Sequence, residues 1–94
     1  MLLNACSSKV ETPSGLRLNE DTQTLTWHRI SSAKGYAVQI TGQEERIIRT
    51  NSISLESLEP GEYEIRIKAL GDQEDTDDSG WVSYQYTREV ESGL

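Results

Sequence analysis

Apolar and polar residues alternate with a period of two through most of the chain between Thr12 and Thr87. This alternation is typical of β-strands with one buried face, because successive side chains on a strand point to opposite faces of the sheet. Threonine, isoleucine, valine and tyrosine fill many of these positions, as a pleated, half-buried surface favours. Seven short segments carry the pattern, at residues 16–18, 25–27, 36–40, 47–49, 53–55, 63–69 and 82–86.

Residues that favour turns separate these segments, for example Asn19-Glu20-Asp21, Thr41-Gly42, Pro60-Gly61 and Gly71-Asp72. No stretch of the chain repeats its apolar residues with a helical period. The pattern therefore predicts an all-β domain, a seven-stranded antiparallel Greek-key β-sandwich of the immunoglobulin-like type. The expected core consists of apolar residues from both sheets: Leu16, Leu18, Leu25, Trp27, Tyr36, Val38, Ile40, Ile47, Leu55, Leu58, Ile65, Ile67 and Tyr84.

Four segments resemble the fibronectin type III family, and the resemblance covers nearly all of Pro13–Thr87. They are Pro13-x-x-Leu16, Leu25-Thr26-Trp27, Gly35–Ile40 and Leu58–Ala69. The resemblance implies a core tryptophan on the second strand and a corner formed by Leu58 and Tyr63 before the sixth strand. The spacing from Leu58 to Tyr63 is one residue shorter than in many animal members of the family. An immunoglobulin domain would instead need a cysteine pair and a tryptophan on the third strand.

The first residues resemble the end of a bacterial lipoprotein signal. Leu3-Asn4-Ala5-Cys6 is similar to the lipobox, in which the cysteine becomes the lipidated N-terminus. This resemblance implies an extracytoplasmic protein at the bacterial cell surface, with Cys6 as the lipid attachment site and the only membrane contact. The alternative is an ordinary free thiol in a tail.

The predicted organisation has three parts. Residues 1–11 are expected to be a signal-peptide remnant and flexible tether, residues 12–88 the β-sandwich, and residues 89–94 the start of a linker to a downstream domain.

Charge and composition exclude several classes of function. The 94 residues include 16 acidic and 9 basic side chains, for a net charge of −7, which argues against nucleic-acid binding and favours a soluble monomer. One cysteine excludes an internal disulfide and a cysteine-rich zinc cluster. His28 lies at an outward strand position without a nucleophile motif, and the paired carboxylates lie in turns or on outward faces. We therefore expect no enzyme and no cofactor.

Two features remain as candidates for ligand contact. Residues 71–80 are rich in acidic side chains, and Asp75-x-Asp77-x-Ser79-Gly80 matches the first half of a calcium loop. Tyr86 occupies the position where such a loop needs a glutamate, so a solvated acidic loop is the favoured interpretation. Trp81 precedes the last strand, out of phase with it. It could offer an aromatic platform for a sugar, although cover for the sandwich edge is favoured.

The sequence therefore supports two hypotheses of different class. The first is a non-catalytic fibronectin type III spacer or interaction module at the N-terminus of a larger bacterial surface lipoprotein. Its partner would be the downstream domain of the same chain. The second is a glycan- or protein-binding module that uses Trp81 and the loops at one end of the sandwich.

Overall fold

The computed structural model describes residues 8–72, 74 and 76–89. These residues form nine β-strands: β1 (Ser8–Lys9), β2 (Arg17–Asn19), β3 (Thr24–Thr26), β4 (Gly35–Ile40), β5 (Arg46–Ile48), β6 (Ser52–Ser54), β7 (Gly61–Leu70), β8 (Thr76–Asp77) and β9 (Val82–Arg88). The described residues contain no helix, and so none that could cross a membrane.

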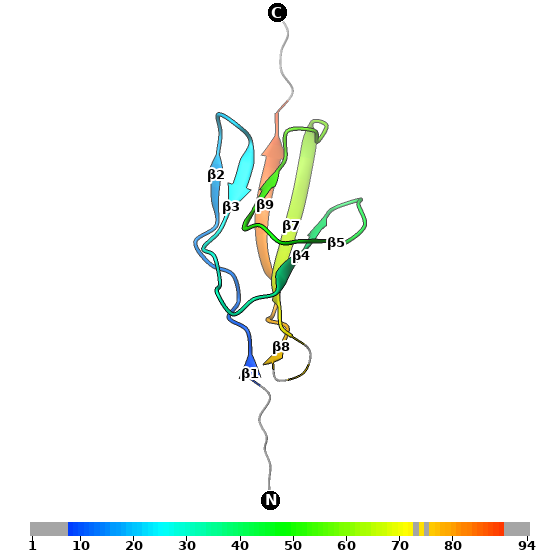
Figure 1. Ribbon diagram of the computed structural model, residues 1–94. Coiled ribbons are helices and arrows are strands. Elements are labelled where there is room, and N and C mark those ends of the chain that lie inside the picture. Colours follow the sequence, from blue (N-terminus) through cyan, green and yellow to red (C-terminus); the bar gives the residue numbers. More distant parts are fainter. Residues whose placement is uncertain (1–7, 73, 75, 90–94) are drawn as a thin grey trace, which may run out of the picture.

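The strands form two antiparallel sheets and one short parallel pair (Figure 1). The larger sheet has the order β5-β4-β7-β9, and the smaller has the order β2-β3-β6. The pair β1-β8 is parallel and two residues long. The predicted all-β class with antiparallel sheets is confirmed. The described part of the chain has nine strands rather than the predicted seven, because β1 and β8 add a small sheet below the sandwich.

The core lies between the two antiparallel sheets. On β4 and β7, Tyr36 is paired with Ala69, Val38 with Ile67, and Ile40 with Ile65, so their side chains share one face. All six are buried. The facing sheet contributes Leu25 and Ile53, which are paired with each other, and Trp27 follows directly after β3. The Trp27 ring meets Tyr36 edge to face, with 5.4 Å between the ring centroids. This packing gives the sandwich one continuous apolar centre.

Four residues of the predicted core are less buried than expected. Ile47 is 59% exposed, and Leu16, Leu18 and Tyr84 are only partly buried. Leu16, Leu18 and Tyr84 lie on, or next to, the terminal strands β2 and β9. Ile47 is paired with Ala37 on the outer face of the larger sheet, so its assignment to the core was wrong.

The N-terminal boundary also differs from the prediction. Residues 1–11 were expected to be a tether, but Ser8 and Lys9 are paired with Thr76 and Asp77, and the Val10 amide donates a 3.1 Å hydrogen bond to the Asp77 carbonyl. Val10 is buried in the core. Residues 8–10 are therefore part of the folded domain, because pairing with the distant β8 fixes a segment whose own sequence predicts no strand.

The chain enters and leaves the sandwich at opposite ends of β7 (Figure 1). The first strand, β1, is paired with β8, which follows shortly after β7 ends at Leu70. The last strand, β9, ends at Arg88, which is paired with Gly61 at the start of β7. The ten residues of β7 span about 30 Å. The two ends of the described chain are therefore separated by roughly the length of the domain.

Candidate functional site

The two residues singled out for function have different outcomes. Cys6 lies outside the described residues. Trp81 lies immediately before β9, on the outer face of the larger sheet. The β7–β9 register pairs Val82 with Ile67, so Trp81, one residue earlier, lies next to Lys68, one residue later on β7. The structure thus places this ring over the middle of the sheet and not among the loops at its end.

The Trp81 ring is held by two cations of β7. The Arg66 Cζ atom and the Lys68 Nζ atom each lie 4.9 Å from its centroid. Each such contact contributes about 0.5–1 kcal/mol at a surface. The Arg66 guanidinium also donates a 2.9 Å hydrogen bond to Gln39 on β4, and Lys68 forms a 3.3 Å ion pair with Asp78. Intramolecular partners therefore already contact this ring on the outer face of the sheet.

The acidic loop uses its polar groups for its own structure. The Asp72 carboxylate accepts hydrogen bonds from the amides of Glu74 and Thr76, at 2.9 and 3.0 Å. The buried Ser79 hydroxyl accepts a 2.9 Å bond from the Ala69 amide and donates to the Gly80 carbonyl. Asp75, the first oxygen donor of the half-matched calcium pattern, lies outside the described residues. A Ser79 hydroxyl buried in this way is not presented to an ion, which favours the solvated-loop interpretation.

The residues considered for acid–base chemistry are exposed to solvent. His28 is exposed, and its imidazole lies over Gly15, where a Cβ atom would come within 2.7 Å of Nε2. Glu44, Glu45 and Glu62 are exposed as well. Within the described ranges, no three His, Cys, Asp or Glu residues lie close enough together to hold a metal ion.

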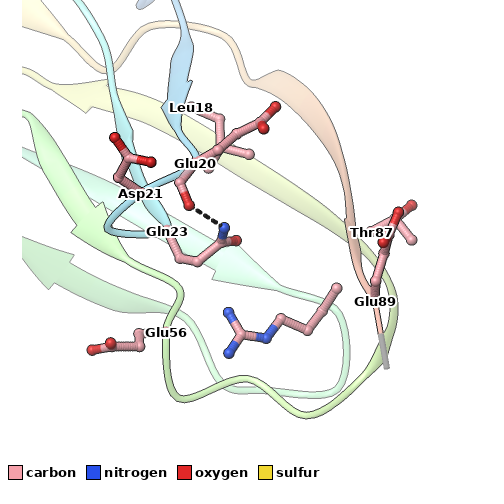
Figure 2. Close-up of a pocket in the computed structure, with 8 residues that line it drawn as sticks. Leu18, Glu20, Asp21, Gln23, Glu56, Thr87 and Glu89 are labelled. Carbon is pink, nitrogen blue, oxygen red and sulfur yellow. Dashed lines mark hydrogen bonds between the residues drawn. The ribbon is translucent and has the colours of Figure 1, made fainter. Parts of the chain in front are cut away.

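One open cavity lies at the end of the sandwich where the chain leaves it (Figure 2). Its volume is about 560 Å³, and its walls come from the β2–β3 turn, the β6–β7 connection and the end of β9. The lining residues are Leu18, Glu20, Asp21, Gln23, Glu56, Thr87, Arg88 and Glu89. Four of these eight are acidic and exposed, so the hollow resembles a solvated end of the domain more than an enclosed ligand site.

Gln23, at the inner wall of this cavity, has a role that the sequence did not suggest. Its backbone has a φ of 53°, which is uncommon for a residue other than glycine. Its side-chain amide donates a 2.7 Å hydrogen bond to the backbone carbonyl of Glu20. Its backbone carbonyl accepts a 2.7 Å bond from the Leu55 amide, and its side-chain oxygen accepts one from the Tyr86 hydroxyl. The turn-forming residues before it predict a turn, but its partners lie up to 63 positions away.

The corner before β7 forms as the family resemblance implied. The Tyr63 hydroxyl donates a 2.6 Å hydrogen bond to the carbonyl of Glu59, four residues earlier. Leu58 is buried in the core. The shorter spacing of these residues therefore still permits the hydrogen bond that closes the corner.

Neither a family model nor a curated protein matches the chain. Among solved structures, a fibronectin type III-like (Fn3-like) protein from Clostridium thermocellum is similar, with a TM-score of 0.53 and 22% sequence identity. The match covers 89% of this chain and 100% of the other. The fold is fibronectin type III-like. At this level of identity the similarity establishes the fold alone.

Proposed function

We propose that this fibronectin type III-like domain is a non-catalytic spacer at the N-terminus of a larger bacterial cell-surface lipoprotein. In this proposal the three-on-four sandwich is a Greek-key module, the lipid on Cys6 holds it at the membrane, and a linker that starts at Glu89 leads to a downstream domain of the same chain. The observation that carries the proposal is the path of the chain, which enters beside β8 and leaves at the far end of β7.

This path suits a spacer because the domain adds its whole length between its neighbours. A domain whose two ends lay side by side would add almost no reach. Here, all seven residues of the last strand, β9, are paired with residues of β7. A force that pulls on both ends of the domain would shear β9 against β7 along the strand direction. The backbone hydrogen bonds between the two strands would then resist together.

The reach of the spacer can be measured directly. Cysteines are introduced by Lys9→Cys and Glu89→Cys in a Cys6→Ala background, and both carry spin labels. We expect a label separation of about 30 Å or more, set by the length of β7. A separation of about 10 Å, as for ends that lie side by side, would overturn the spacer geometry. Both altered positions are exposed, so the fold should tolerate the labels.

The membrane anchor needs a separate experiment. The complete gene product is expressed in a bacterial host, with Cys6 and with Cys6→Ala, and both are analysed by membrane fractionation and intact mass. We expect membrane association and the added mass of a diacylglyceryl group for the first protein only. Unmodified, soluble protein in both cases would remove the anchor and the cell-surface location from the proposal, while leaving the spacer geometry to the distance measurement.

The ligand-binding alternative is less well supported. It requires the Trp81 ring to be available, whereas Arg66 and Lys68 already contact that ring. A glycan array with the unaltered chain and with Trp81→Ala tests this alternative, and a saturable signal that the substitution abolishes would restore it.

A further inference from the structure

Among the described strands, the longest edge that no other strand pairs with belongs to β9. This strand is terminal in the order β5-β4-β7-β9, and within the described chain its backbone is paired with β7 alone. It has seven residues, whereas the other terminal strands of the two sheets, β2, β5 and β6, have three each. An edge of this length presents a row of amide and carbonyl groups that can pair with a further strand.

Six of the seven residues of β9 lack the devices that usually protect an edge, and its one charged residue, Arg88, lies at the C-terminal end of the strand. Residues 82–87 are Val-Ser-Tyr-Gln-Tyr-Thr and contain no charge, proline or glycine. The short strand β5, by comparison, begins at Arg46 and is followed by Arg49. Charged residues and short length discourage edge pairing, so β9 is the least protected edge of this molecule. In the N-terminal segment, the Thr12 side chain lies near Gly80, which precedes β9.

The same residues are complementary to themselves in the antiparallel direction. A two-fold axis through Gln85 would place Tyr84 opposite Tyr86 of a second copy, and Ser83 opposite Thr87 of that copy. The tyrosines would lie on the inner face, where Tyr84 is only half-buried in the single chain. The hydroxyl pair and the two glutamines would lie on the outer face. Aromatic pairs and Ser–Thr pairs are among the favourable cross-strand neighbours, and no two like charges would face each other.

From this edge we infer that β9 pairs with β9 of a second copy, antiparallel and about a two-fold axis at Gln85. The two four-stranded sheets then form one continuous sheet of eight strands. This inference departs from the monomer expected from net charge. The charge of −7 on each copy opposes association over long range, but the edge itself is neutral through Thr87. Because salt screens long-range repulsion, the dimer should become tighter as ionic strength rises.

Sedimentation equilibrium tests the association with the full chain under reducing conditions, so that Cys6 cannot form a disulfide. We expect the weight-average mass to rise from one chain toward two as the concentration increases from micromolar to millimolar. A mass of one chain at every concentration and ionic strength would overturn the inference.

Two variants test the register without disturbing the monomer. Gln85 is opposite Glu64 on β7, so Gln85→Lys gains an opposite charge within the chain. Across the two-fold axis, however, the two new lysines would face each other and should prevent dimerisation. In the double variant Ser83→Glu/Thr87→Lys, the new side chains are opposite Arg66 and Glu62 within the chain. They would also attract each other across the interface, so we expect a dissociation constant at least several-fold lower than for the unaltered chain.

Each result has a definite meaning. A Gln85→Lys chain that dimerises like the unaltered chain, or a double variant that does not dimerise more tightly, would overturn the pairing at β9. Loss of the dimer on Ile47→Lys but not on Gln85→Lys would overturn it in favour of the β5 edge. Thermal melts of each variant at a concentration where only the monomer exists establish that the fold is intact.

An antiparallel pair also places the N-terminal end of one copy beside the C-terminal end of the other. For copies anchored through Cys6, this geometry would join two facing membranes; this step rests on the proposed function. Vesicles that carry the chain coupled through Cys6 to a maleimide lipid should cluster, and Gln85→Lys should keep them dispersed. Dispersed vesicles from a chain that dimerises in solution would overturn this step alone, whereas fractionation tests the anchor itself.

Discussion

The hydroxyl of Tyr86 donates a hydrogen bond to the side-chain oxygen of Gln23, and this bond joins the two sheets of the sandwich. Tyr86 lies on β9 of the larger sheet, and Gln23 lies in the turn between β2 and β3 of the smaller one. The Gln23 carbonyl also accepts from Leu55, after β6. One turn residue therefore connects three strands at the end of the domain where the chain leaves.

Removing the Tyr86 hydroxyl should weaken this connection. Tyr86 is 2% exposed, so Tyr86→Phe leaves the Gln23 oxygen without its donor in a partly buried place. We expect the free energy of unfolding to fall by about 1 kcal/mol, measured by urea denaturation. Tyr84→Phe is the matched control on the same strand. Equal stability losses for the two variants would contradict a specific role for the bond to Gln23.

The two tryptophans should differ in their effect on stability. Trp27 is 2% exposed in the centre of the sandwich, so Trp27→Ala should cost about 3–5 kcal/mol of folding free energy. Trp81 is half-buried on the outer face, and Trp81→Ala should cost about 1 kcal/mol through loss of its contacts with Arg66 and Lys68. Thermal melts of both variants test the order, and a greater loss for Trp81 would contradict the position of the core.

Trp27→Phe separates the ring of Trp27 from its polar group. The indole N–H of Trp27 is buried and finds no hydrogen-bond acceptor among the described residues. A phenylalanine removes this unsatisfied donor and keeps an aromatic ring against Tyr36. We therefore expect Trp27→Phe to cost less than half as much as Trp27→Ala. A cost as large as that of alanine would indicate that the N–H has a partner in solution.

Two glycines should respond differently to an added methyl group. A Cβ atom on Gly71 would lie 2.5 Å from the Thr76 carbonyl oxygen, which belongs to the backbone of β8 and cannot rotate away. Gly42 has a φ of 81° but open space around it. Gly42→Ala should cost about 1 kcal/mol from backbone strain. Gly71→Ala should cost more and disturb the β1–β8 pair. Amide exchange at Val10, whose amide is bonded to Asp77, should report the difference.

Alternation along the chain predicted the centre of the fold well. Ile65 and Ile67 are fully buried, as are Val38 and Ile40 on the neighbouring strand, because a central strand covered by the other sheet follows its period of two. The contribution of Val10 could not be predicted in this way. Val10 is buried because β1 is paired with β8, some 68 residues later, and local pattern contains no information on such a distant partner.

The candidate site was predictable in part for the same reason. The phase of Trp81 relative to β9 indicated an outward ring, but not that Arg66 and Lys68 lie beside it, because that depends on the β7–β9 register. The turn before Gln23 was visible in the sequence, whereas its bond to Tyr86 depends on how the sheets pack. Residue pattern thus predicts strands and faces, and the pairing of distant strands decides which polar groups meet.

Ile47 provides a direct test of the difference between strand pattern and sheet position. Its place in an alternating segment predicted a core residue, yet it is 59% exposed on the outer face of the terminal strand β5. Ile47→Ala should therefore change the free energy of unfolding by no more than about 0.5 kcal/mol. Ile67→Ala, on the central strand β7 and fully buried, should cost about 2–5 kcal/mol. Chemical denaturation of the two variants measures the contrast. A loss at Ile47 comparable to that at Ile67 would mean that β5 turns its isoleucine inward in solution, which would reverse the assignment of the outer face.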